Sequence, residues 1–206
     1  VVSLFCALAA TWFFKKIALK FGIVDKPNDT VKTHKEPVAY LGGVGILAGT
    51  VAGTLAGIYC LYGYEQFLPV MKRLFGILAG ASIACFVGLI DDILDIRPTR
   101  KMLGQTIAAF TLIAVGIIPA LRYFTDPFGW QMSDWLEIAI GIPIVIFFVL
   151  GATNSLNLLD GLDGLCGGVT AIITFGMLLL AVHRSTWGFS DVGDPVRVII
   201  CLALFG

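Results

Sequence analysis

Residues 138–182 read IAIGIPIVIFFVLGAT (138–153), NSLNLLDGLDG (154–164) and LCGGVTAIITFGMLLLAV (165–182), so that a polar segment separates two apolar runs. A helix that crosses a membrane needs about 20 predominantly apolar residues, and about 17–25 are tolerated. We therefore expect two membrane-spanning helices that are joined by a polar turn at one membrane surface.

The composition of the whole chain agrees with a membrane protein. Hydrophobic residues make up 58% of the 206, only 14% are charged, and the mean hydropathy is +0.92. A soluble domain of this length does not need so much apolar surface. The formal net charge is zero, which argues against a nucleic-acid partner. The five cysteines form no C-x-x-C pair, so we interpret them as packing residues.

Apolar runs along the chain predict about six complete or nearly complete spans and the start of a seventh. The predicted spans are residues 1–14, 41–63, 74–90, 102–121, 138–153 and 165–182, and the seventh begins at 198. We expect an all-α, polytopic integral membrane helical bundle that forms one domain over residues 1–206. Because the chain starts without methionine and both ends lie in apolar runs, we also expect a fragment of a longer protein.

Successive spans reverse direction, so three loops should share one membrane face: residues 15–40, 91–101 and 154–164. These loops contain nine Lys and Arg residues, against five on the other face. Loops rich in Lys and Arg remain in the cytoplasm. We therefore place the three loops, and with them every concentrated polar motif, on the cytoplasmic side.

The first polar motif follows the third predicted span. Asp91, Asp92 and Asp95 lie three or four residues apart, so their carboxylates can converge if the helix continues. Such a cluster needs a cation, and oxygen ligands suit Mg²⁺ or Mn²⁺. The alternative is a set of interfacial acids that pair with nearby basic residues. Among those basic residues Lys101 is the strongest candidate for binding phosphate, as a point charge.

The second polar motif is the segment between the last two spans. Its polar side chains recur at every third residue, at Asn154, Asn157, Asp160 and Asp163. Two glycines in the same segment, Gly161 and Gly164, disfavour a helix interior and predict an unwound turn where a ligand can meet the backbone. The alternative is a solvated polar hairpin without a ligand. Polar groups beside a bilayer are costly unless they bind something, which favours a site.

The first cytoplasmic loop contains a third motif. It reads DKPNDTVKTHKEPVAYLGG over residues 25–43 and includes His34 and Lys35. Its final Gly-Gly opens the next predicted helix, and helix N-termini favour anions. A lone loop histidine is most often solvated, but its basic neighbours favour a role for His34 in binding.

Together the three motifs resemble the polyprenyl-phosphate N-acetylhexosamine-1-phosphate transferases. They are D-K-P…K-x-H-x2-P-x3-L-G-G (25–43), D-D-I-L-D (91–95) and N-x2-N-x2-D-G-x-D-G-L (154–165). Within that family they are most similar to the bacterial undecaprenyl-phosphate GlcNAc-1-phosphate branch. The resemblance implies a Mg²⁺-dependent membrane enzyme that moves a sugar-1-phosphate from a UDP-sugar to a polyprenyl phosphate and releases UMP. Mn²⁺ is an alternative metal.

The resemblance also implies roles for individual residues. The catalytic residues would be Asp91, Asp92 and Asp160. The metal ligands would be Asn157, Asp91 and Asp92. The substrate-binding residues would be Lys101, Asn154, Asp163, Gly164, His34 and Lys35.

The implied partners are a UDP-N-acetylhexosamine, undecaprenyl or another polyprenyl phosphate, and the lipid bilayer of the bacterial inner membrane. The resemblance leaves open whether the protein forms a homodimer. A Gly-Asp-x-Gly-Ser motif of the family is not found in these 206 residues. We therefore expect this chain alone to lack a complete metal site and to be inactive. The alternatives are a truncated, non-catalytic relative and an ion-coupled transporter. Acids at helix ends, with no charge in the middle of any span, favour the enzyme over the transporter.

Overall fold

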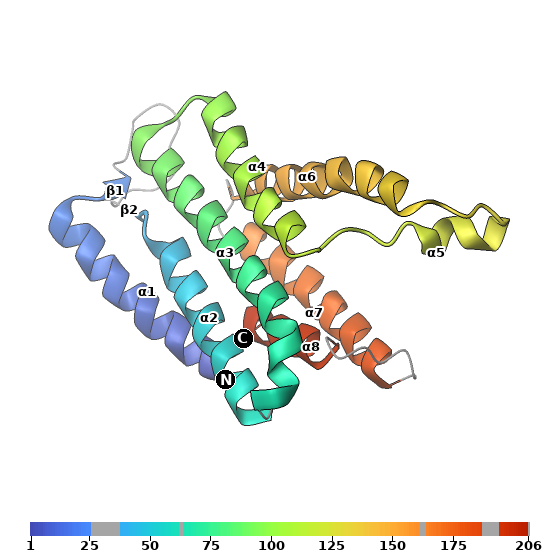
Figure 1. Cartoon of the computed structure of the whole chain (residues 1–206). Helices are drawn as coiled ribbons and strands as arrows, with labels where there is room; N and C mark the ends of the chain where they lie inside the picture. The colour runs from blue at the N-terminus through green and yellow to red at the C-terminus, as the bar shows by residue number, and fades with distance from the viewer. Residues whose placement is uncertain (26–37, 62–63, 161–163, 187–193, 206) are drawn as a thin grey trace. The chain divides into compact units, whose positions relative to one another are not determined.

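The computed structural model describes residues 1–25, 38–61, 64–160, 164–186 and 194–205 (Figure 1). His34, Lys35, Gly161 and Asp163 therefore lie outside the described residues. The described part contains α-helices, one short 3₁₀ helix and a pair of two-residue strands. In chain order these are α1 (Val2–Phe21), β1 (Val24–Asp25), β2 (Val38–Ala39), α2 (Gly42–Leu61), α3 (Tyr64–Leu94), α4 (Pro98–Ala114), α5 (Arg122–Thr125), η1 (Asp126–Phe128), α6 (Asp134–Leu159), α7 (Leu165–Thr186) and α8 (Asp194–Phe205).

Five of these helices, α1, α2, α3, α6 and α7, are long and apolar enough to cross a membrane. Only 11–22% of the residues in their apolar stretches are buried, which suits helices whose apolar surface faces lipid. The prediction of an all-α, polytopic membrane protein is confirmed.

The predicted fourth span, residues 102–121, differs from the observed helix. Helix α4 begins at Pro98 and ends at Ala114, so it has 17 residues. Gly116 has a φ of 80°, its N–H donates to Ile113 O, and the N–H of Ile117 donates to Leu112 O. These two bonds form a Schellman motif, which ends a helix even inside an apolar run. Composition alone therefore overestimated the length of this span.

Helices α1, α3, α6 and α7 are longer than their predicted spans. Helix α1 continues past Lys15 and Lys16 to Phe21, because lysine is a good helix former and its long side chain can reach the membrane surface. Residues 64–73, predicted as a connection, form the first turns of the 31-residue helix α3.

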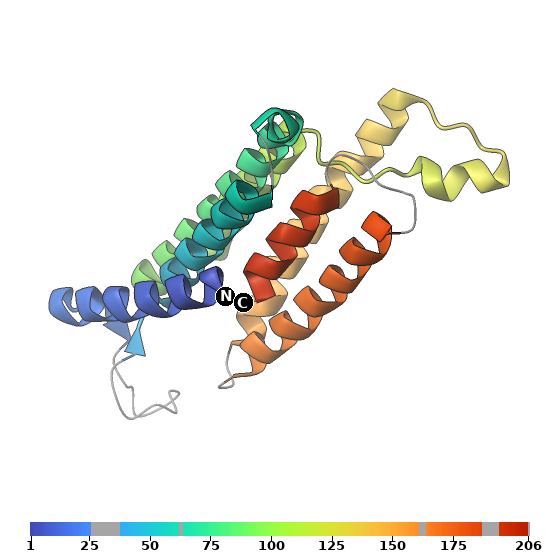
Figure 2. The ribbon, with the colours of Figure 1, turned by 90° about the horizontal axis from the view of Figure 1, so that it is seen from below.

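The chain divides into two compact units. The first consists of Val1–Val70, Gly88–Ile96 and Gly167–Gly206, and the second of Met71–Val87 and Arg97–Cys166. In the first unit α1 packs along α2, and α8 contacts both helices. The hydroxyl of Ser3 donates to Ala203 O, so the start of α1 lies beside the end of α8 (Figure 2).

Glycines on α2 permit the close approach of α1. A Cβ added at Gly49 would lie 2.5 Å from Ala7 Cβ, and one added at Gly53 would lie 2.6 Å from Ser3 Cβ. Small residues of this kind let the backbones of membrane helices pack together. In the second unit α4 packs against α6.

Candidate functional site

The structure brings together one residue from each of two predicted motifs in the second unit. Lys101, in the first turn of α4, donates from Nζ to Oδ1 of Asn157 in the last turn of α6, over 2.7 Å. These helices run antiparallel here, since the start of one meets the end of the other. The predicted phosphate-binding lysine and the predicted amide metal ligand are therefore neighbours.

A second polar pair joins the same two helices one turn away, where Gln105 follows Lys101 in α4 and Asn154 precedes Asn157 in α6. Asn154 Nδ2 donates to Gln105 Oε1 over 2.8 Å, and Gln105 Nε2 donates to Asn154 Oδ1 over 3.4 Å. Gln105 is only 3% exposed. The sequence analysis did not select Gln105; a long amide in an apolar span, four residues after Lys101, was the signal that could have found it.

The predicted turn after Asn157 is confirmed at its described ends. Helix α6 ends at Leu159, Asp160 is an exposed turn residue, and α7 begins at Leu165. Gly164 has a φ of 78°, a left-handed conformation that other residues rarely adopt.

The acidic motif lies at the end of α3, in the first unit. Asp91 and Asp92 are in the last helical turn, and Asp91 is half-buried. Asp95 is past the helix end, with a φ of 45°, and its N–H donates to Asp91 O. The expected convergence of all three carboxylates is wrong, because among the described residues no three His, Cys, Asp or Glu side chains could hold one metal ion together. The left-handed residue breaks the helical spacing on which that expectation depended.

A hairpin at the base of the first loop lies near this acidic end. Val24 pairs with Ala39 and Asp25 with Val38, and the hydroxyl of Tyr40 donates to Asp25 Oδ1 over 2.9 Å. Burial raises the pKa of the Tyr40 hydroxyl, and the hydrogen bond and charge of Asp25 and the charge of Asp92 raise it further. Asp92 is therefore close enough to act on Tyr40. Neither Tyr40 nor Asp25 was selected as a site residue from the sequence.

Comparison with known sequences identifies the family. Residues 74–206 match the sequence profile of glycosyl transferase family 4. The chain belongs to this family.

Several relatives of this family 4 chain are curated bacterial proteins. It is 33% identical over 190 residues to the probable undecaprenyl-phosphate N-acetylglucosaminyl 1-phosphate transferase of Bacillus subtilis, which covers 91% of the chain and 48% of that protein. It is 31% identical over 208 residues to the undecaprenyl-phosphate alpha-N-acetylglucosaminyl 1-phosphate transferase of Yersinia pestis, with 97% and 53% covered. The protein of that name from Escherichia coli K12 is 30% identical, with 87% and 46% covered. The chain spans about half the length of these relatives.

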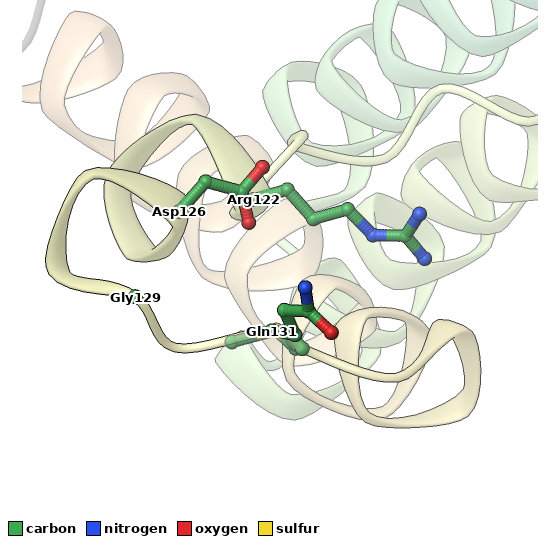
Figure 3. A pocket seen from close by; sticks show the side chains of 5 residues that line it. Arg122, Asp126, Gly129 and Gln131 are labelled. Carbon is green, nitrogen blue, oxygen red and sulfur yellow. The ribbon is translucent and has the colours of Figure 1, made fainter.

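The family 4 chain also has a surface concavity of about 400 Å³ in the second unit (Figure 3). It is lined by Arg122, Asp126, Gly129, Gln131 and Met132. The guanidinium of Arg122 pairs with Asp134 and Glu137 in the first turn of α6. This concavity is therefore at the opposite end of α6 from Asn157, and none of the predicted site residues lines it.

Proposed function

We propose that the complete gene product transfers N-acetylhexosamine-1-phosphate, with GlcNAc as the preferred sugar, from a UDP-sugar to undecaprenyl or another polyprenyl phosphate. UMP is released, and the reaction is the first membrane step in the synthesis of a cell-envelope polysaccharide. The names of the relatives and the three sequence motifs support this proposal. The observation that carries it is the 2.7 Å contact between Lys101, the predicted phosphate-binding residue, and Asn157 of the third motif.

The proposed reaction brings two anions together. An oxygen of the lipid phosphate forms a bond to the phosphorus that bears the sugar, and the bond from that phosphorus to the bridging oxygen of UMP breaks. UMP leaves with the electron pair. Cationic groups must offset the charge on the transferring phosphoryl group and on the leaving group. Lys101 is suited to this role because its ammonium is a compact charge in the first turn of α4, beside Asn157.

The oxygen donors in the motifs fit Mg²⁺, which prefers carboxylate and amide oxygens. Asn157 is exposed and its Oδ1 accepts one hydrogen bond from Lys101, and a carbonyl oxygen has two lone pairs. The resemblance, rather than the placement of the residues in the structure, supports Asn157, Asp91 and Asp92 as the residues that would hold the metal. When bound, Mg²⁺ would neutralise phosphate charge and so favour the displacement.

The proposal also gives roles to three carboxylates. Asp91, Asp92 and Asp160 lie at helix ends, where aqueous substrates have access. A lipid phosphate is already ionised near neutral pH, so a strong general base is not needed. Asp91 and Asp92 would instead act by holding a cation that offsets the phosphate charge, and Asp160 would support these ligands. We place these helix ends on the cytoplasmic side of the bacterial inner membrane, since the loops there carry the excess of Lys and Arg.

The test is UMP release by the complete gene product, with UDP-GlcNAc and undecaprenyl phosphate as substrates. We expect Asp92→Asn to lower turnover by about two to three orders of magnitude, because the substitution weakens the electrostatic stabilisation of the transferring phosphoryl group. Asp126→Asn is a matched control, because Asp126 lines the concavity near the other end of α6. Wild-type turnover in the Asp92 variant, or no UMP release by the unaltered protein, would contradict the proposal.

A further inference from the structure

The buried amide of Gln105 is unusual in its surroundings. The residue lies in α4, where Ala108 and Ala109 are also buried. An amide buried away from water is costly unless its hydrogen-bonding groups are satisfied. Gln105 meets this requirement through Asn154, which lies 49 residues further along the chain.

The hydrogen bonds of Asn154 use both of its amide hydrogens. Nδ2 donates to Gln105 Oε1 over 2.8 Å and to the carbonyl oxygen of Leu150 over 2.8 Å. Its Oδ1 accepts from Gln105 Nε2. An asparagine amide has two donor hydrogens, so none remains for a substrate. This arrangement argues for a positioning role for Asn154 instead of the substrate contact expected from the resemblance.

Helical spacing connects this amide pair to the site. Gln105 lies four residues after Lys101, and Asn154 lies three residues before Asn157. Residues three or four apart share one helix face. The Gln105–Asn154 pair and the Lys101–Asn157 pair are therefore consecutive contacts between the same two faces of α4 and α6.

We propose that Gln105 and Asn154 are positioning residues, whose reciprocal amide pair sets the register of α4 against α6 so that Lys101 meets Asn157. Successive residues of an α-helix point about 100° apart, so a slip of a single residue would replace Lys101 by a neighbour on another face at the position opposite Asn157. The pair resists such a slip because loss of the contact would leave the buried amide of Gln105 unsatisfied. This inference rests on the proposed function for its effect on turnover.

The test exchanges the two amides. Gln105→Asn and Asn154→Gln each change the combined length of the pair by one methylene, whereas the double exchange restores it. In the complete gene product we expect each single variant to lower turnover in the UMP assay about tenfold or more, and the double exchange to recover most of it. Gln131→Asn is a matched control in the loop before α6 and should leave turnover unchanged.

A coupling measurement separates positioning from a general loss of stability. If Gln105 acts through Lys101, then Lys101→Ala should cause a much smaller further loss of turnover in the Gln105→Asn background than in the unaltered protein. A purely structural Gln105 predicts equal losses in both backgrounds, and that result would overturn the inference. Failure of the double exchange to recover turnover would also overturn it.

Thermal unfolding of the same variants distinguishes this inference from the proposed function. If the unaltered protein releases no UMP, the proposed function fails, and the amide pair is then judged by its unfolding midpoint alone. Single variants with lowered midpoints and a double exchange with a restored midpoint would support the pairing. A double exchange no more stable than the single variants would overturn it.

Discussion

Substitution of Gly49 by alanine tests how closely α1 and α2 pack. The added Cβ would lie 2.5 Å from Ala7 Cβ and 2.7 Å from both Cα and N of Ala7. Non-bonded carbon atoms are most favourable at about 3.5–4.0 Å. The backbones must therefore separate by about 1 Å or more, since the nearest atoms belong to the backbone and first side-chain atom of Ala7, which cannot rotate away.

The separation would also disturb neighbouring contacts between the two helices. Gly45 of α2 approaches Thr11 of α1, and Gly53 approaches Ser3, as closely as Gly49 approaches Ala7. Overpacking of this kind costs about 1–3 kcal/mol. Gly176→Ala in α7 is the matched control, since a Cβ there would meet no atom within 4 Å. Alanine should stabilise that helix by up to about 1 kcal/mol through its higher helix propensity.

The assay is unfolding of the protein in one defined detergent or lipid, with both variants measured under the same conditions. We expect Gly49→Ala to be less stable than Gly176→Ala by about 1–3 kcal/mol, which is the overpacking cost, because both substitutions lie inside helices and gain the same helix propensity. Equal stability of the two variants would show that α1 and α2 are not packed through Gly49, and would refute the reasoning.

Two further predictions concern residues outside the pairs between α4 and α6. Burial, and then Asp25 and Asp92, raise the pKa of Tyr40 in the folded protein above its value in the unfolded chain. The neutral phenol therefore adds stability at pH values below the pKa of the unfolded chain. This contribution is lost as the pH rises through the pKa of the folded protein. An ultraviolet pH titration should show that Tyr40→Phe removes a phenol that ionises at higher pH than an ordinary tyrosine; loss of a phenol with an ordinary pKa would contradict the electrostatic contact. Arg122→Gln should lower stability by about 1 kcal/mol or less, because its ion pairs are partly exposed, and should leave UMP release unchanged; a loss of turnover without unfolding would show that this loop contributes to the site.

Much of the architecture follows from local sequence patterns. Long apolar runs predicted the membrane-spanning helices, because a helix satisfies its own backbone in lipid and needs only length and apolar side chains. The polar segment with Gly161 and Gly164 predicted the break between α6 and α7 for an equally local reason, since Gly164 adopts a left-handed conformation. At Gly116 a local turn motif ends α4 inside an apolar run, so composition placed the end of this helix too late in the sequence.

The candidate site was only partly predictable. Its motifs identified Lys101 and Asn157, but their pairing depends on how α4 packs against α6. The roles of His34, Lys35 and Asp163 stay predictions, since these residues lie outside the described ranges.

Local pattern therefore determined which segments are helices, where most of them end and which polar residues are candidates for chemistry. Tertiary structure decided which polar residues meet, including three that the sequence had not selected: Gln105 pairs with Asn154, Lys101 with Asn157, and Tyr40 with Asp25. The physical reason is that a hydrogen bond between distant segments depends on helix register and hairpin pairing, which are set by the packing of side chains across the interface. Helical periodicity places a side chain on a face, but it does not specify the face that lies opposite.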